Sequence, residues 1–328
     1  MNVNAKVALV CASHSPLIYC YARPPACHEE SERQYAQRAA EIRAFDPELV
    51  IVFGPDHFNG FFLDLMPPFC AGLKCQAVGD IGGFAGPLRV AGDEALACIQ
   101  AVRAAGVDLA VSYDMTVDHG FSQTMHRTLG ALDVYPCIPI FVNGIAPPFV
   151  PFRRSRLLGE AIGQFAAGLG KRVLFLASGG MSHNPTRYYP KFGSADKRVT
   201  GYQLTGGADA AGLSKAEWLE RLDVMHREGA QMLVDGRRTR DDLKLNPAFD
   251  RQFLDLITST KLARVDELDP VWMVENAGIG SLELHTWVAA TAAYAAAGGG
   301  APAVDLYAEA LEYGIAFGMV HGGMEARA

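Results

Sequence analysis

The feature that most constrains the fold of this chain is a short apolar run that ends in a turn and a histidine, repeated four times. Residues 50–53 are apolar, stop at Gly54-Pro55 and lead directly to His57. This ending is typical of a buried strand in an open α/β sheet, which presents polar side chains at the carboxyl ends of its strands. The same arrangement precedes three further histidines: His14 after residues 7–11, His119 after residues 109–113 and His183 after residues 173–177. We therefore expect four histidines at one edge of the sheet.

Helical patterns fill most of the intervals between these runs. Strands that alternate with helices of ordinary length indicate βαβ units and a largely parallel sheet. The sequence thus predicts an α/β fold with a mixed, largely parallel central sheet flanked by helices, as one domain over residues 1–328. A further strand is expected at residues 137–142. The expected helices cover residues 29–45, 93–105, 120–132, 155–169, 214–234, 249–258 and 281–297.

Three segments do not follow this alternation. Residues 61–66 form an apolar run closed by two prolines, which predicts a second extended segment. Residues 79–86 carry four glycines, but no Lys-Ser/Thr pair follows them, so a mobile connection is favoured over a phosphate cradle. Periodicity fails over residues 184–207, which we interpret as a lid or an irregular segment, because long loops in compact domains are often functional.

Composition narrows the class of partner. Half of the residues are hydrophobic, so the chain can bury a sizeable core. The formal net charge is −7, with acidic and basic residues interspersed, which argues against a nucleic-acid or anionic membrane surface. The uncharged residues 286–304 include three consecutive glycines and Pro302, so we expect a buried helix and a turn rather than a membrane span. These features favour a small-molecule partner.

The cysteines indicate a reducing compartment. There are seven, an odd number, with no Cys-x-x-Cys pair, and the sequence starts without a basic and apolar leader. Reduced thiols in the cytoplasm are therefore expected, without a zinc knuckle or a disulfide framework. We also expect identical chains to assemble into a homo-oligomer.

Imidazole is the commonest transition-metal ligand, and two histidines with one carboxylate suit iron(II) oxygenases because three coordination positions stay open. Glu283 is an attractive carboxylate, since its predicted helical face also carries Trp287 and Tyr294 and should be buried. A carboxylate on an apolar face needs a partner, which a metal can provide. The alternative is a first-turn glutamate favoured by the helix dipole. For the remaining histidines we expect ordinary core or surface roles: His28, His126, His226, His285 and His321.

Several motifs in this order resemble the class III extradiol ring-cleavage dioxygenases. The resemblance covers most of the chain and departs over residues 19–30 and 184–207. The motifs that carry it are Ser13-His-Ser-Pro16, Pro55-Asp-His-Phe-Asn-Gly-Phe-Phe62, Met66-Pro-Pro-Phe-Cys70, Val117-Asp-His-Gly-Phe121, residues 172–183 and Glu283-Leu-His-Thr-Trp-Val-Ala-Ala290.

The resemblance implies an iron(II) enzyme that cleaves a 3-substituted catechol beside its hydroxyls with dioxygen, in aromatic-compound catabolism. It implies that His14, His57 and Glu283 bind the iron, that His183 accepts a proton and that His119 donates one. The expected substrate is 2,3-dihydroxyphenylpropionate or 2,3-dihydroxycinnamate, and the product a yellow 2-hydroxy-6-oxo-diene-dioate. The alternatives are another catechol, a metal-binding member that is not a dioxygenase, and a zinc hydrolase.

An acidic substrate tail would need a cationic partner, and arginine pairs with carboxylates bidentately. Arg187 is the first candidate because it follows His183 by four residues within the irregular segment. Arg153 and Arg154 are weaker candidates, since they precede a helix and are expected to be solvated charges.

Overall fold

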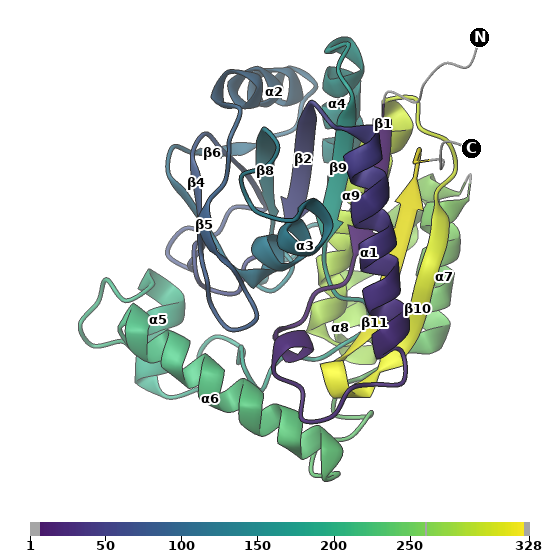
Figure 1. Cartoon of the computed structure of the whole chain (residues 1–328). Coiled ribbons are helices and arrows are strands. Elements are labelled where there is room, and N and C mark those ends of the chain that lie inside the picture. The colour runs from purple at the N-terminus through teal and green to yellow at the C-terminus, as the bar shows by residue number, and fades with distance from the viewer. Residues whose placement is uncertain (1–6, 260, 325–328) are drawn as a thin grey trace.

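The computed structural model describes residues 7–259 and 261–324, and a mixed sheet of eight strands runs through it (Figure 1). These strands are β1 (Val7–Ala12), β2 (Leu49–Gly54), β3 (Phe69–Gly72), β6 (Ala110–Ser112), β8 (Cys137–Val142), β9 (Val173–Ser178), β10 (Ala303–Ala310) and β11 (Ile315–Gly322). Their order is β10-β11-β1-β9-β2-β8-β3-β6. The central strands β1, β9, β2 and β8 are parallel. Strand β11 runs antiparallel to β1 and β10, and β3 runs antiparallel to β8 but parallel to β6. The predicted mixed, largely parallel sheet is confirmed.

Helices cover both faces of the sheet. Helices α1 (His28–Phe45) and α3 (His119–Leu129) lie on one face, and the other face packs against α2 (Gly92–Ala104), α4 (Phe152–Gly168), α7 (Pro247–Thr258), α8 (Pro270–Asn276) and α9 (Leu284–Ala296). Strand β1 shows the alternation: Leu9 and Cys11 belong to the core under α4 and α9, and Ala8 and Val10 to the core under α1 and α3. A strand buried on both faces must be apolar throughout, which explains the continuous apolar runs.

Two glycines of α4 fix the position of α9. A Cβ added at Gly159 would lie 2.1 Å from the carbonyl oxygen of Ala289, and one at Gly163 would lie 2.2 Å from that of Ala293. Only a residue without a side chain permits this approach of the two backbones. Helix α9 also packs against β9, β1 and β2. The short 3₁₀ helix η3 (Ile279–Glu283) that precedes it ends at the carboxyl edge of the strands.

A smaller layer lies beyond the carboxyl ends of the strands. Helices α5 (Lys197–Thr205) and α6 (Lys215–Val234) form an arm below the main sheet in Figure 1. A separate apolar cluster joins them to the loops after β2 and β9, through Phe58, Tyr188, Tyr189, Tyr202 and Trp218. A three-stranded sheet of β4 (Cys75–Val78), β5 (Ala85–Pro87) and β7 (Met115–Val117) lies near α3. Further 3₁₀ helices are η1 (Pro16–Tyr19), η2 (Leu262–Glu267) and η4 (Leu311–Tyr313).

Most predicted elements are confirmed, and two expectations are wrong. Residues 61–66 do not form an extended segment, because the buried carboxylate of Asp56 accepts hydrogen bonds from the backbone of Asn59, Gly60 and Phe61 and turns the chain. Residues 184–207 are not irregular throughout, since they contain α5, which Asp196 caps. Within the described ranges, no helix is both long and apolar enough to cross a membrane.

Candidate active site

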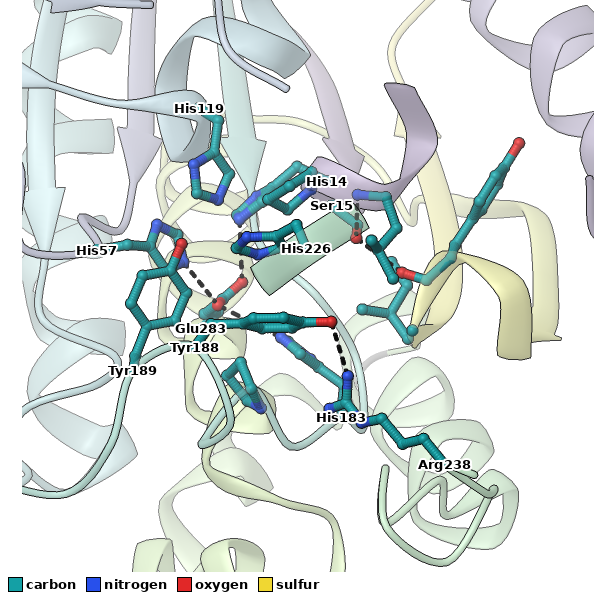
Figure 2. A pocket seen from close by; sticks show the side chains of 16 residues that line it. His14, Ser15, His57, His119, His183, Tyr188, Tyr189, His226, Arg238 and Glu283 are labelled. Carbon is teal, nitrogen blue, oxygen red and sulfur yellow. Dashed lines mark hydrogen bonds and ion pairs between the residues drawn. The ribbon is translucent and has the colours of Figure 1, made fainter. Parts of the chain in front are cut away.

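The structure brings the four predicted histidines and Glu283 into one pocket (Figure 2). His14 follows β1, His57 follows β2 and His183 follows β9, so neighbouring parallel strands deliver these three to the same edge of the sheet. His119 arrives differently, as the first residue of α3, where the side chain of Asp118 caps the helix. The pocket is lined by His14, Ser15, Pro16, Leu17, His57, His119, His183, Pro185, Tyr188, Tyr189, His226, Arg238, Glu283, Tyr313, Gly314 and Ile315.

Glu283 lies between three of the histidines. Its Oε2 atom is 3.4 Å from Nε2 of His14, and its Oε1 atom is 3.3 Å from Nε2 of His57 and 3.6 Å from Nε2 of His183. The backbone N–H of Gly180 also donates to Oε2, at 2.6 Å. Burial raises the pKa of Glu283, but the charge interaction with His14 and the nearby imidazoles of His183 and His57 outweigh burial and hold it well below its ordinary value. Glu283 is therefore a buried carboxylate anion.

Groups behind His14 and His57 orient both rings. Nδ1 of His57 donates to Asp118 at 3.2 Å, and Nδ1 of His14 lies 2.9 Å from Oγ of Ser178. Each ring thus turns its Nε2 atom toward Glu283, which is the arrangement of metal-ligating histidines with outer hydrogen-bond partners. Burial lowers the pKa of His14 to about 3, so this imidazole is neutral. Burial also lowers the pKa of His57, but Asp118 and Glu283 outweigh it and raise the pKa well above its ordinary value.

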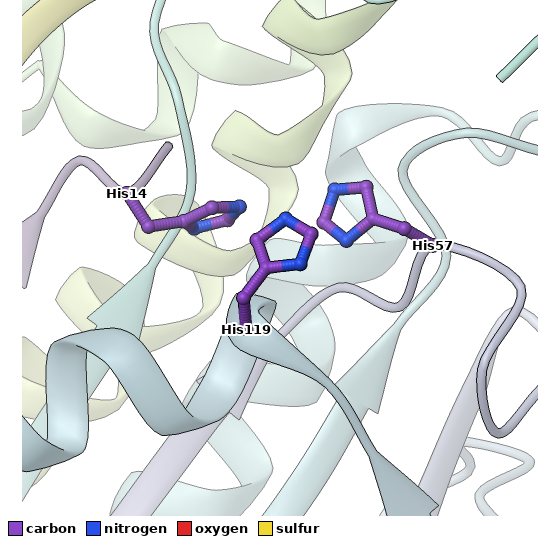
Figure 3. A group of neighbouring side chains, drawn as sticks. All are labelled: His14, His57 and His119. Atoms are coloured by element: carbon purple, nitrogen blue, oxygen red, sulfur yellow. The ribbon is translucent and has the colours of Figure 1, made fainter. Parts of the chain in front are cut away.

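These residues fit a metal cation. Two buried imidazoles place their Nε2 atoms 3.4 and 3.3 Å from a buried carboxylate. The raised pKa of His57 means that the surroundings stabilise positive charge beside Glu283. A metal ion would bring that charge in place of a proton. A second set of possible metal ligands competes with His14, His57 and Glu283, because nitrogen atoms of His14, His57 and His119 lie within 4.8 Å of one another (Figure 3).

His119 is held as firmly as the expected ligands. Its Nδ1 atom donates to the buried carboxylate of Asp80, and its backbone N–H donates to the same carboxylate at 2.7 Å. Its ring stacks on that of His57, with centroids 4.3 Å apart and an angle of 18° between the planes. Because Nδ1 is occupied, Nε2 is the atom of His119 that is available for chemistry.

His183 is held in the tautomer that a base requires. Its Nδ1 atom lies 2.8 Å from the carbonyl oxygen of Met181, which can only accept a hydrogen bond, so Nδ1 carries the proton. In neutral His183 the Nε2 atom is therefore an unprotonated acceptor, and it faces Glu283 across the pocket.

Two glycines form a slot for the His183 ring. A Cβ added at Gly180 would lie 2.4 Å from Cε1 of that ring, and one at Gly280 would lie 2.2 Å from Cε1 and Nε2.

Gly280→Ala should therefore displace the imidazole and lower turnover about 100-fold or more, as expected for losing a general base, while metal content stays unchanged. Initial rates and metal analysis of the purified variant test this. Gly168→Ala is the control, since a Cβ there meets no atom within 4 Å. Near-wild-type turnover of Gly280→Ala would contradict the slot.

The lining residues that were not predicted from the sequence include four from the segment after β9 and from α6 and the turn that follows it. Tyr188 and Tyr189 come from the segment after β9, His226 from the middle of α6 and Arg238 from the turn that follows α6. The expectation of an ordinary role for His226 overlooked this position: its ring stacks on Tyr188 at 3.7 Å between centroids. No predicted strand ends directly before these residues, so only a conserved pattern among homologues could have marked them from sequence.

The predicted arginines lie elsewhere. The guanidinium of Arg187 pairs with Glu228 of α6, and Arg187 is not among the lining residues. Arg153 and Arg154 lie in the first turn of α4, and neither lines the pocket. The prediction that Arg187 reaches the cavity through its closeness to His183 in sequence is thus not supported, because its side chain turns toward α6.

Comparison with known proteins gives one consistent family. The family model described as "Catalytic LigB subunit of aromatic ring-opening dioxygenase" matches residues 8–316. A protein of Pseudomonas putida named 2,3-dihydroxyphenylpropionate/2,3-dihydroxicinnamic acid 1,2-dioxygenase 2 is 43% identical over 290 residues, which cover 88% of this chain and 90% of that protein. A protein of Burkholderia vietnamiensis named 2,3-dihydroxyphenylpropionate/2,3-dihydroxicinnamic acid 1,2-dioxygenase is 42% identical over 320 residues, which cover 96% of this chain and 96% of that protein.

Proposed function

Because this chain belongs to the LigB family of aromatic ring-opening dioxygenases, we propose that it uses iron(II) and dioxygen to cleave a 3-substituted catechol beside its hydroxyls. The proposed substrate is 2,3-dihydroxyphenylpropionate or 2,3-dihydroxycinnamate, for which relatives at 42–43% identity are named. The observation that carries the proposal is the convergence of Glu283, two oriented imidazoles and two further histidines in one buried pocket.

We assign the metal to His14, His57 and Glu283. Iron(II) held by these residues would bind the catechol and dioxygen and would supply the redox chemistry of ring cleavage. The protein would contribute one negative and two neutral donors, so the net positive charge of the site would favour a catecholate monoanion. Ser178 and Asp118 keep the two rings in place while substrate enters.

His183 is the proposed proton acceptor. A catechol that binds through both oxygens must lose a phenol proton, and Nε2 of His183 is the unprotonated nitrogen on this side of the pocket. Histidine is the side chain that most often acts as a general base of this kind. The slot formed by Gly180 and Gly280 keeps the ring at one distance from the substrate oxygens.

His119 is the proposed proton donor. Asp80 holds its Nδ1 atom, and stacking on His57 fixes the plane of the ring, so a proton on Nε2 is delivered in one direction. Tyr189 closes the pocket over His57, with 5.1 Å between ring centroids. Its buried hydroxyl finds no hydrogen-bond partner in the described part of the chain and is free to donate to a substrate oxygen.

Oxygen consumption tests this function. Protein loaded anaerobically with iron(II) should take up one molecule of dioxygen per catechol and turn the solution yellow, in a panel of catechols with and without an acidic side chain. The same protein loaded with zinc(II) should consume no oxygen. Hydrolysis by the zinc form without oxygen uptake would instead identify a zinc hydrolase, and metal binding without either activity would identify a binding protein.

We further propose that residues 1–328 form one domain that works in the cytoplasm as a homo-oligomer. All seven cysteines are free thiols, which suits a reducing compartment. The family match over residues 8–316 favours a single unit. Light scattering on the purified protein measures the number of chains per particle.

A further inference from the structure

A buried arginine without an acidic partner lines the pocket. Arg238 is 6% exposed, and no carboxylate of the described residues lies within ion-pair distance of its guanidinium. Arg38, a buried arginine outside the pocket, differs from Arg238 in this respect, because its guanidinium pairs with Glu41 at 2.8 Å and with Asp305 at 3.7 Å. A buried charge is costly unless an opposite charge or hydrogen bonds compensate it. Arg238 therefore provides a site at which an anion would be stabilised.

Neutral groups hold the guanidinium in place. Nη1 donates to the hydroxyl of Tyr188 at 2.8 Å, and Nη2 donates to the carbonyl oxygen of Asn184 at 2.9 Å. A guanidinium carries five N–H groups, so these two bonds leave donors for a further acceptor. Tyr188 and Asn184 both belong to the segment directly after His183. These two hydrogen bonds therefore hold Arg238 against the loop that carries the proposed base.

Arg238 lies at the end of the pocket away from His57. In Figure 2 the two residues are on opposite sides of the Tyr188 ring, whose hydroxyl points toward Arg238. A catechol whose hydroxyls face His14, His57 and Glu283 leaves this end for a ring substituent. The substituent would pass Tyr188, which presents an apolar ring and a polar tip.

We propose that Arg238 binds the carboxylate of the substrate's side chain and so sets the preference for acidic 3-substituted catechols. This inference rests on the proposed function. A planar guanidinium can pair with a carboxylate through two parallel hydrogen bonds, which fixes both the position and the charge of the tail. Binding of the anion also supplies the counter-charge that the buried arginine lacks.

The test compares two substrates that differ in charge. For Arg238→Leu, the ratio of kcat/KM for 2,3-dihydroxyphenylpropionate to that for 3-propylcatechol should fall about tenfold or more, as expected for a charge-assisted contact. Arg238→Lys keeps a point charge without the fork, so it should retain part of the preference. Arg221→Leu is the matched control, because Arg221 donates to the carbonyl oxygen of Tyr188 from α6 but does not line the pocket. Its ratio should equal that of the wild type.

Calorimetric binding of 3-phenylpropionate, which has the tail but no hydroxyls, separates this inference from the proposed function. The wild type should bind this anion about tenfold or more tightly than Arg238→Leu does, whether or not any catechol is cleaved. Ring cleavage in the wild type with an unchanged substrate ratio and unchanged anion binding in Arg238→Leu would overturn the role of Arg238 alone. Anion binding that depends on Arg238, without cleavage of any catechol, would overturn the proposed function and leave the anion site standing.

Discussion

Glu283→Ala, His14→Ala and His57→Ala are each expected to lose bound metal and ring-cleavage activity together. Loss of a group that merely orients a ligand typically costs about 10–100-fold, so loss of a ligand should cost more than about 100-fold in turnover. Glu283 has the strongest physical case, since its carboxylate contacts three imidazoles and accepts the N–H of Gly180. Metal analysis and oxygen uptake measured on the same samples test the expectation.

The ligand variants need a check on folding. Glu283→Gln keeps the shape of the side chain and removes its charge, so it should also lose metal while its thermal unfolding stays close to that of the wild type. Full iron occupancy in Glu283→Ala would remove Glu283 from the ligand set.

Activity of the wild type should fall on exposure to oxidants and return with ferrous iron and a reductant.

His119→Ala and His183→Ala are expected to keep metal and to lose turnover by about 10²–10⁴-fold, the range of general acid–base catalysis. Their rings are held by Asp80 and by the carbonyl of Met181, so each offers one nitrogen to the substrate. His285→Phe is the control, because His285 is a buried histidine outside the pocket that stacks on Phe152. More than a tenth of wild-type turnover in either pocket variant would contradict the assigned role.

The part of the fold that positions the site could be predicted from sequence. Strands β1, β2 and β9 are apolar throughout because both of their faces are buried, and each ends at a turn that releases a histidine. The helix expected over residues 214–234 likewise begins where Ser214 and Glu217 form a reciprocal capping box. These signals are local, so one sequence is enough to find them.

The rest depends on contacts between distant segments. The extended segment expected at residues 61–66 is replaced by a turn because a single carboxylate, Asp56, binds three backbone N–H groups. His226 and Arg238 enter the pocket only because α6 folds back over the strand ends, and no local pattern records that path. Arg187 shows the converse, since closeness to His183 in sequence did not bring it to the cavity.

The assignment of the ligands is the central claim, because His119 is close enough to His14 and His57 to replace Glu283 in the set. The most direct measurement is the metal content of Glu283→Ala and His119→Ala after identical anaerobic loading with iron(II). We predict wild-type metal content in His119→Ala and little metal in Glu283→Ala. The reverse result, with metal lost from His119→Ala and kept by Glu283→Ala, would show that three histidines bind the metal and would contradict the role of His119 as proton donor.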